Sequence, residues 1–382
     1  MAVDRRRFLG AVGVGAGLLM TEGVAEGSAE GVAEADDFAE ARGEVRVYLG
    51  TYTTWTGGGA GLGVGAYDPA TGRLRSTGVV RGVPNPSFAI TAGRRVYAVN
   101  EQSAGSVTAF EVRDGVPKVL NTQSTGGADP CHLVLHRGHV LSANYSSGSV
   151  SVHPVRPDGS LGARTDLVRH KGSGPDPDRQ EGPHAHQVLS DPTGEFVFAV
   201  DLGADAVFGY RLSAAGRLTE VSTARLHPGA GPRHLAFHPN GRFAYVANEL
   251  DSTIVVASYA HGVLTPGQKL STLPADAPTT PRNYPAEVLV SADGRFVYLS
   301  NRGHDSVAVF AVEQDGARLR LVEAVPVGGE FPRHLALDPA GRFLLAANQN
   351  SNAVTTFAVD RESGRLRLTS TFTAPIPVCV AF

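Results

Sequence analysis

Two histidines, His184 and His186, stand two residues apart at the start of an expected strand. Alternate residues of a strand share a face, so this pair could hold a metal ion, with Asp201 or Asp205 as a further ligand. Alternatively, His186 could be a general acid or base, or a structural histidine whose hydrogen bonds are all satisfied. We favour a site without metal or cofactor.

Charged residues stand at equivalent places where other strands begin or end. Arg233 begins one apolar strand, and Glu249, 16 residues later, ends the next. Antiparallel pairing should therefore make them neighbours. Plainer explanations stay open: Glu249 as a surface carboxylate in a salt bridge, Arg302 as a turn residue, and Arg233 as a structural residue repeated in Arg333.

These residues belong to a repeat, and repeats decide the fold. Each unit has four short strands separated by turn residues. One column marks the end of a strand in every unit, at Thr51, Asn100, Asn144, Asp201, Asn248, Asn301 and Asn348. Seven units predict an all-β fold, a seven-bladed β-propeller. Segment 376–382 matches the strand that the first unit lacks, so the C-terminal strand should close blade one and remove the free edges.

Loops on one face of this ring are the candidate site, because loops on a rigid scaffold usually carry function. Insertions 169–182 and 274–284 should open onto the face that holds Arg233 and Glu249, around the mouth of the central channel. The next repeat column contains three histidines that we expect to be structural and hydrogen-bonded between blades: His132, His234 and His334.

Composition narrows the function. The chain has 382 residues and a net charge of −3, which gives no reason to expect nucleic acid as a partner. Its 46 glycines and 24 prolines suit a turn-rich β protein. Cys131 and Cys379 fall in non-adjacent blades, so no disulfide is expected. The glycine-rich segment 57–63 precedes no helix and therefore does not indicate a phosphate-binding loop.

The N-terminus resembles a twin-arginine export signal. Residues 5–9 read Arg-Arg-Arg-Phe-Leu, and an uncharged run to Met20 follows that is too short to span a bilayer. We predict a signal peptide over 1–35, a disordered linker over 36–43 and the propeller over 44–382. The protein should then use the twin-arginine export machinery, carry no stable membrane anchor, and work in the periplasm or outside the cell.

Several motifs together resemble the bacterial seven-bladed β-propeller lactonase family. They are Pro-His-Ala-His-Gln at 183–187, Gly-Pro-Arg-His at 231–234 with Asn-Glu at 248–249, Ser-Asn-Arg-Gly at 300–303, and Pro-Arg-His at 332–334 with Ala-Asn-Gln at 347–349. The resemblance covers about 44–382. The family includes 6-phosphogluconolactonases of the propeller type and, more distantly, the fungal carboxy-cis,cis-muconate lactonizing enzymes.

The resemblance implies a catalytic set of one histidine, two arginines and one glutamate. By motif these fall on His186, Arg233, Glu249 and Arg302. Other polar residues of the same columns are candidates for substrate binding: His184, Glu101, Arg333 and Gln349.

The implied function is hydrolysis of a sugar-acid lactone, as in a 6-phosphogluconolactonase, at the channel mouth. His186, or else Glu249, would take a proton from water, and Arg233 and Arg302 would bind the oxyanion. Two alternatives stay open. The same groups in reverse roles would form a lactone, as in a muconate-type cycloisomerase, and an exported propeller could bind a lactone or sugar acid without turnover.

Overall fold

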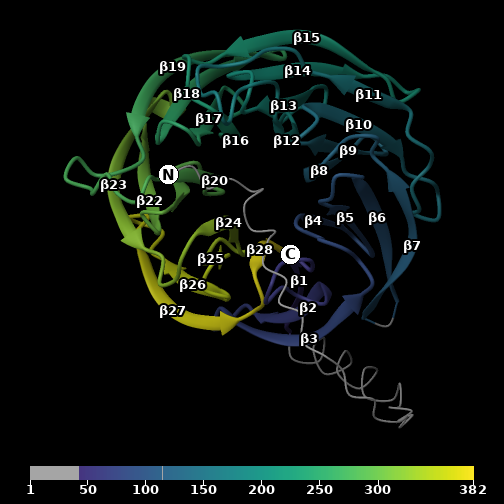
Figure 1. Cartoon of the computed structure of the whole chain (residues 1–382). Helices are drawn as coiled ribbons and strands as arrows, with labels where there is room; N and C mark the ends of the chain where they lie inside the picture. The colour runs from purple at the N-terminus through teal and green to yellow at the C-terminus, as the bar shows by residue number, and fades with distance from the viewer. Residues whose placement is uncertain (1–42, 114) are drawn as a thin grey trace, which may run out of the picture.

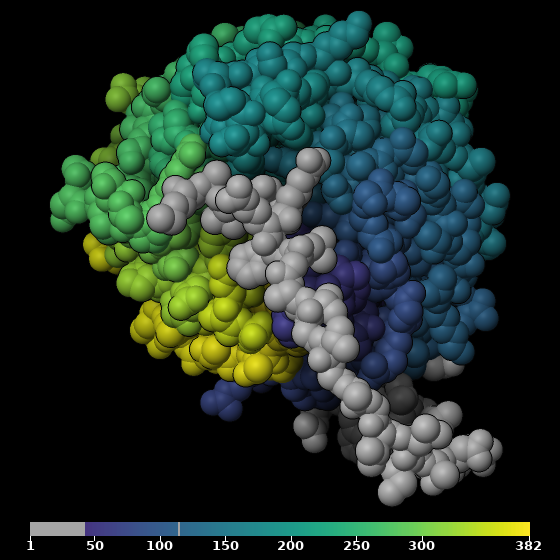
Figure 2. All heavy atoms as spheres, in the orientation of Figure 1, coloured from purple at the N-terminus to yellow at the C-terminus, as the bar shows by residue number. Residues whose placement is uncertain are grey.

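The computed structural model describes residues 43–113 and 115–382. There, 28 strands form seven antiparallel sheets of four strands, arranged as blades in a ring (Figure 1). A space-filling view shows the blades following one another in chain order around a disc (Figure 2). The predicted seven-bladed β-propeller is therefore confirmed. The predicted signal peptide 1–35 lies outside the described residues, as does the linker 36–43 except for Gly43.

Each blade runs from the axis of the ring to its rim. The strands nearest the axis are β28 (Pro377–Ala381), β4 (Ala89–Ala92), β8 (Pro130–His136), β12 (Ala185–Ser190), β16 (Pro232–Phe237), β20 (Tyr284–Val290) and β24 (Pro332–Leu337). The second strands are β1 (Val45–Thr51), β5 (Arg95–Asn100), β9 (His139–Asn144), β13 (Val197–Asp201), β17 (Phe243–Asn248), β21 (Phe296–Arg302) and β25 (Phe343–Asn348).

The third strand of each blade is largely buried, and the rim strand is the most exposed of the four. The third strands are β2 (Gly61–Asp68), β6 (Ser106–Arg113), β10 (Ser149–Pro154), β14 (Ala206–Leu212), β18 (Thr253–Ala260), β22 (Ser306–Glu313) and β26 (Ala353–Val359). The rim strands are β3 (Arg73–Arg81), β7 (Val116–Ser124), β11 (Asp166–Arg169), β15 (Leu218–Arg225), β19 (Val263–Ser271), β23 (Arg318–Pro326) and β27 (Leu366–Thr373).

Helical structure is nearly absent from the described part of the chain. It consists of one 3-10 turn, η2 (Gln314–Gly316). None of the helices within 43–113 and 115–382 has the length and apolar character needed to cross a bilayer.

Apolar side chains fill the space between neighbouring blades. Each of the seven blade junctions contains one buried apolar cluster. Between blades five and six, for example, Tyr245 and Ala247 of β17 pack with Val297 and Leu299 of β21. Strand residues alternate between the two faces of a sheet, so one blade can feed two junctions at once. This packing fixes the positions of the inner strands.

The C-terminal strand closes the ring, as the sequence predicts. In β28, Val380 pairs with Leu49 of β1 and Cys379 pairs with Gly50. Gly50 is needed for this close approach, because a Cβ there would lie 2.8 Å from the Cβ of Cys379 and 2.7 Å from the carbonyl oxygen of Ser87. Cys131 and Cys379 are free thiols, so the expected absence of a disulfide between them agrees with the structure.

Closure by β28 can be tested with one buried charge. Val380 is 3% exposed and lies in the cluster between blades seven and one. Val380→Asp should lower the free energy of unfolding by about 3 kcal/mol or more, because the carboxylate would be buried without a partner. Leu368→Asp on rim strand β27, where the side chain is 45% exposed, is the control and should change it by about 0.5 kcal/mol or less. Equal effects in urea unfolding would contradict this account.

Candidate functional site

A buried carboxylate, Glu249, is bound by three arginines. Its Oε1 lies 2.6 Å from Nη2 of Arg179, and its Oε2 lies 2.7 Å from Nη2 of Arg302 and 3.3 Å from Nε of Arg233. Glu249, Arg233 and Arg302 are at most 5% exposed. Antiparallel pairing therefore makes Arg233 and Glu249 neighbours, as expected, and the structure also brings Arg302 to the same carboxylate.

Two neighbouring blades, five and six, and one loop supply these side chains. Arg233 is the second residue of β16, Glu249 follows the end of β17, and Arg302 ends β21. Backbone carbonyls hold two of the guanidinium groups: Ala286 accepts from Nη1 of Arg233 at 2.7 Å, and Tyr284 accepts from Nε of Arg302 at 3.1 Å. The arginines are thus fixed by strands rather than by flexible segments, which keeps the site preorganised.

Arg179 is a member of this cluster that the sequence analysis missed. It lies in the insertion between β11 and β12, and it also donates to the hydroxyl of Tyr145 through Nη2 at 3.0 Å. An insertion has no counterpart in the other repeats, so a comparison of columns could not single it out. The available signal was the expectation that this insertion opens onto the face that holds Glu249.

A β-bulge places several of these residues at one level. In six blades the pairing register between the inner strand and the second strand shifts by a bulge. The bulge leaves one residue of the inner strand without a partner on the second strand, or two residues in β20. Bulges re-aim the side chains around them and are common beside active sites. The residues skipped by the pairing are Cys131, His186, Arg233, Ala286 with Glu287, Arg333 and Val378.

Burial and neighbouring charges set the protonation states of the cluster. Burial raises the pKa of Glu249, but Arg302, Arg179 and Arg233 outweigh it and hold that pKa well below its usual value. Burial, followed by repulsion from Arg302 and Arg333, lowers the pKa of Arg233 to about 9. Glu249 is therefore ionised and Arg233 is charged at pH 7.

His186 is buried and lies beside this cluster. Its Nδ1 has no hydrogen-bond partner among the described residues, and its ring makes edge contacts with Tyr145 and His234 at centroid distances of 5.6 and 5.1 Å. Burial, and then the charge of Arg233, lower the pKa of His186 well below its usual value. The imidazole is therefore neutral at pH 7 and able to accept a proton.

His184 faces a different environment from His186. Its Nδ1 lies 3.1 Å from the carbonyl oxygen of Tyr145 and its Nε2 lies 3.2 Å from Oε1 of Glu181. Asp201 is bound to the backbone N–H of His184 and to the ring of His170. No group of three His, Cys, Asp or Glu residues suited to a metal ion occurs in the part of the chain that the structure describes.

Asp205, the other carboxylate considered as a metal ligand, is also engaged in the fold. Its oxygens accept hydrogen bonds from Nε2 of Gln180 and from the backbone N–H groups of Gly229 and Gly231, all at 2.7 Å. Asp205 therefore ties the insertion before blade four to the segment that leads into β16.

The remaining candidates, Glu101, Arg333 and Gln349, lie on blades two and seven. Oε2 of Glu101 accepts a hydrogen bond from the hydroxyl of Tyr52 at 2.9 Å and lies 3.9 Å from Nη2 of Arg333. The Arg333 guanidinium stands over the Tyr52 ring at 5.8 Å. Gln349 donates to Asn350 at 3.4 Å. Glu101 and Arg333 thus form a second charged pair, separate from the Glu249 cluster.

A layer of rings from the next repeat column packs across the axis. His132 contacts Phe88 and His234 at centroid distances of 4.1 and 5.2 Å, and Phe88 also contacts His334 at 5.6 Å. These rings come from blades two, three, five and seven, so they meet at the centre of the ring.

Hydrogen bonds tie two histidines of this layer to neighbouring blades. Nδ1 of His234 lies 2.9 Å from Oε1 of Glu287, and the backbone N–H of Val380 donates to Nδ1 of His334 at 3.3 Å. Nδ1 of His132 has no hydrogen-bond partner among the described residues, and its ring packs on Phe88 and His234. The expected hydrogen bonds between blades are therefore present for His234 and His334.

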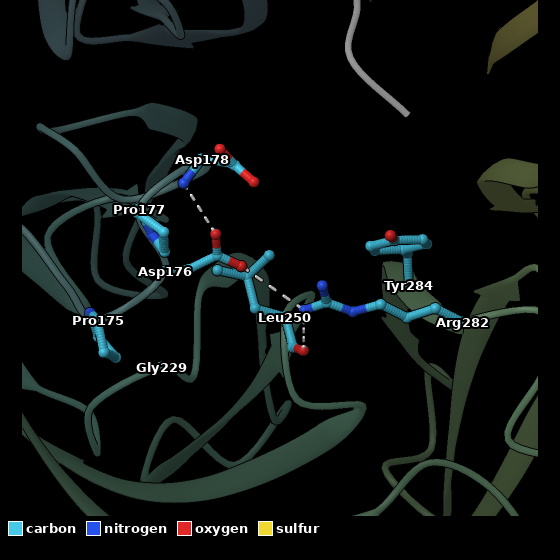
Figure 3. Close-up of a pocket in the computed structure, with 8 residues that line it drawn as sticks. All are labelled: Pro175, Asp176, Pro177, Asp178, Gly229, Leu250, Arg282 and Tyr284. Atoms are coloured by element: carbon cyan, nitrogen blue, oxygen red, sulfur yellow. Dashed lines mark hydrogen bonds and ion pairs between the residues drawn. The ribbon is translucent and has the colours of Figure 1, made fainter. Parts of the chain in front are cut away.

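A cavity of about 490 Å³ is lined by eight residues, among them Leu250 and Tyr284 (Figure 3). Both insertions line it: Arg282 lies 3.8 Å from Asp176 and donates to the carbonyl oxygen of Leu250 at 2.8 Å. Two residues that line the cavity are directly connected to the Glu249 cluster. Leu250 follows Glu249 in the chain, and the carbonyl oxygen of Tyr284 accepts a hydrogen bond from Arg302.

Comparison with known proteins decides the family. The model for the lactonase family with a seven-bladed β-propeller matches residues 46–382. The chain belongs to this family. It is 39% identical to the 6-phosphogluconolactonase of Bacillus subtilis over 295 residues, which cover 75% of this chain and 83% of that protein. The resemblance inferred from the motifs, and with it the lactonase class of enzyme, is confirmed.

Solved structures support the same assignment. The periplasmic gluconolactonase of Pseudomonas aeruginosa is 34% identical, with a TM-score of 0.81 over 88% of this chain and 98% of that one. A Lactobacillus plantarum protein is 36% identical, with a TM-score of 0.83 over 88% and 98% of the two chains. At this coarse level, the comparisons support a lactonase like the 6-phosphogluconolactonases.

The buried histidines should make stability depend on pH. Burial lowers the pKa of His334 to about 4 and lowers those of His132, His186 and His234 well below the ordinary 6.5. Below pH 6.5 the unfolded chain therefore binds protons that the native chain does not. As the pH is lowered, the free energy of unfolding decreases by about 1.4 kcal/mol per pH unit for each histidine. Glu287, whose pKa burial raises, acts in the opposite direction.

His132→Phe isolates one contribution. It should reduce the slope of unfolding free energy against pH between 6.5 and 5 by about 1.4 kcal/mol per unit, measured by urea unfolding. His261→Asn, at an exposed turn, is the control and should leave the slope unchanged. An unchanged slope in His132→Phe would show that this ring takes up a proton in the folded protein.

Proposed function

We propose that the protein hydrolyses a sugar-acid lactone at the mouth of the central channel, with His186, Arg233, Glu249 and Arg302 as the reacting and binding groups. The observation that carries this proposal is the Glu249 cluster: three guanidinium groups on one carboxylate, beside a neutral imidazole with an unpaired nitrogen. This arrangement combines a proton acceptor with fixed positive charge, which is what ester hydrolysis needs.

Hydrolysis would begin with water, activated by His186. The imidazole takes one proton while the water oxygen bonds to the lactone carbonyl carbon, and the carbonyl oxygen becomes an oxyanion. Arg233 and Arg302 stabilise that negative charge, because their positions are fixed before the reaction. The bond from the carbonyl carbon to the ring oxygen then breaks, and the imidazolium returns its proton to the leaving alkoxide. The product is the open-chain hydroxy acid.

Glu249 is a poor candidate for the base. Both of its carboxylate oxygens are already bound by arginines, which hold its pKa well below the usual value, whereas Nδ1 of His186 has no hydrogen-bond partner among the described residues. We assign it the positioning of Arg233 and Arg302. Removing it would leave buried positive charges without compensation, which is strongly destabilising.

The substrate we propose is an aldonolactone. The relatives named 6-phosphogluconolactonase and periplasmic gluconolactonase support this class. Export through the predicted signal at 1–35 would place the reaction outside the cytoplasm, and the similarity to a periplasmic gluconolactonase supports that proposal. The arginines can bind the product carboxylate, since a planar guanidinium matches a carboxylate in two-point contacts.

Substitutions separate catalysis from folding. On glucono-δ-lactone, His186→Gln should lower kcat by about 10²–10⁴-fold and Arg233→Gln by about 10²–10³-fold, with Tm within a few degrees of the native protein. Arg242→Gln is the control, because Arg242 pairs with Asp315 at an exposed turn. Full activity in both site variants would refute the assignment, and binding without turnover in the native protein would indicate a ligand-binding propeller.

The acid side of the pH profile tests His186 separately. Because burial and Arg233 lower its pKa, the imidazole stays neutral to well below pH 6.5, so kcat/KM should remain constant from pH 8 down past 6.5 and fall only in more acidic solution. Initial rates corrected for spontaneous hydrolysis give this profile. A fall centred at pH 6.5 or above would contradict a buried histidine as the base.

A further inference from the structure

The only tryptophan of the chain, Trp55, is 44% exposed although large aromatic side chains are normally buried. It stacks on Tyr52, with ring centroids 4.2 Å apart and planes within 9°. Tyr52 itself is 3% exposed. Tyr52 covers one face of the indole, so the exposed surface of Trp55 must come mainly from the opposite face and the ring edges. We call this pair the Trp55–Tyr52 platform.

The loop that carries Trp55 is held in place by the fold. Oδ1 of Asn85 accepts hydrogen bonds from the backbone N–H groups of Thr53 at 2.9 Å and Thr54 at 3.1 Å. The N–H of Gly58 donates to the carbonyl oxygen of Trp55 at 2.9 Å, and a Cβ on Gly58 would lie 2.0 Å from the carbonyl oxygen of Tyr52. The glycines that follow Trp55 therefore serve a tight turn that presents the indole in one orientation.

The platform is connected to the charged residues around the axis. Tyr52 follows the end of β1 as Glu249 follows the end of β17, so both lie at the same edge of their blades. The Tyr52 hydroxyl donates to Glu101, and the Arg333 guanidinium stands over its ring. The platform and the Glu249 cluster thus belong to one face of the ring, and Arg333 is near enough to Arg233 to lower its pKa.

The chemistry of the platform suits a sugar ring. A pyranose has an apolar face of C–H groups that can pack on an aromatic ring, and hydroxyl groups around it that bind charged and polar side chains. A rigidly held aromatic surface loses little entropy when a ligand covers it. A phosphate group alone would gain nothing from an indole face.

We propose that the Trp55–Tyr52 platform is a subsite for a second pyranose ring, so that the enzyme opens lactones of glycosylated sugar acids. In this arrangement the lactone lies at His186 and Arg233, and the glycosyl unit packs on the free face of Trp55. The reaction class that must supply such a substrate is oxidation of the reducing end of a disaccharide. This inference rests on the proposed function for the identity of the reacting end.

Because Trp55 is the only tryptophan, its fluorescence reports on the platform directly. Full-length protein is titrated with cellobionate and with gluconate. Cellobionate is an open-chain disaccharide acid and has no lactone bond left for the enzyme to hydrolyse. Cellobionate should change the emission with a saturable isotherm, and gluconate should bind at least about threefold more weakly. Absence of a saturable change with cellobionate would overturn the proposal.

Kinetics test the same subsite without fluorescence. In Trp55→Ala the KM for cellobionolactone should rise about three- to tenfold, while the KM for glucono-δ-lactone stays within about twofold. The KM of Trp55→Phe for cellobionolactone should lie between those of the native protein and Trp55→Ala, since phenylalanine keeps a smaller aromatic ring. Val263→Ala, at an exposed position on rim strand β19, is the control and should leave both constants unchanged.

The outcomes separate this inference from the proposed function. If native protein hydrolyses neither lactone but cellobionate still titrates the tryptophan, the proposed hydrolysis fails and the sugar subsite stands. If both lactones are hydrolysed and Trp55→Ala raises both KM values equally or neither, the subsite is refuted and the hydrolysis stands.

Discussion

Pairing of the C-terminal strand β28 with β1 closes the ring, and everything at its centre depends on that closure. The two strands come from opposite ends of the described chain, yet Val380 and Leu49 face each other on paired strands of one sheet. With the ring closed, apolar contact at all seven blade junctions holds the inner strands at fixed positions. Only then can side chains from blades four, five and six share one buried polar site.

Burial of charge is the second constraint. Glu249, Arg233 and Arg302 are removed from water, which is unfavourable for each charge alone and tolerable only when the charges compensate one another. The same burial makes the imidazole of His186 neutral and keeps the arginines in place before any ligand arrives. Compensation and preorganisation therefore have one structural cause, the convergence of strand ends from neighbouring blades.

The sequence was sufficient for the features that repeat. Seven units predicted the propeller, the missing strand of the first unit predicted its closure, and antiparallel pairing predicted contact between Arg233 and Glu249. The alignment of residues between repeats was also correct. The same bulge recurs in six inner strands, so His186, Arg233 and Arg333 occupy equivalent positions in their blades. Repetition makes such positions readable without coordinates.

Features outside the repeat could not be read in this way. Arg179 lies in an insertion with no equivalent in other blades, and its reach to Glu249 depends on the path of that loop. Trp55 follows β1 in a loop whose glycine-rich segment 57–63 was considered only as a phosphate-binding loop and set aside. The stacking of Trp55 on Tyr52 became visible only in the structure. Both ring nitrogens of His184 are engaged by Tyr145 and Glu181, which its spacing from His186 did not reveal.

The most direct measurement is a crystal structure of the protein with gluconate, the open acid that hydrolysis of glucono-δ-lactone would produce. The account predicts that its carboxylate lies within hydrogen-bonding distance of Arg233 and Arg302, with His186 next to the carboxyl carbon. Gluconate bound only elsewhere, for example in the cavity between Asp176 and Arg282, would contradict the assignment of these residues to the reaction.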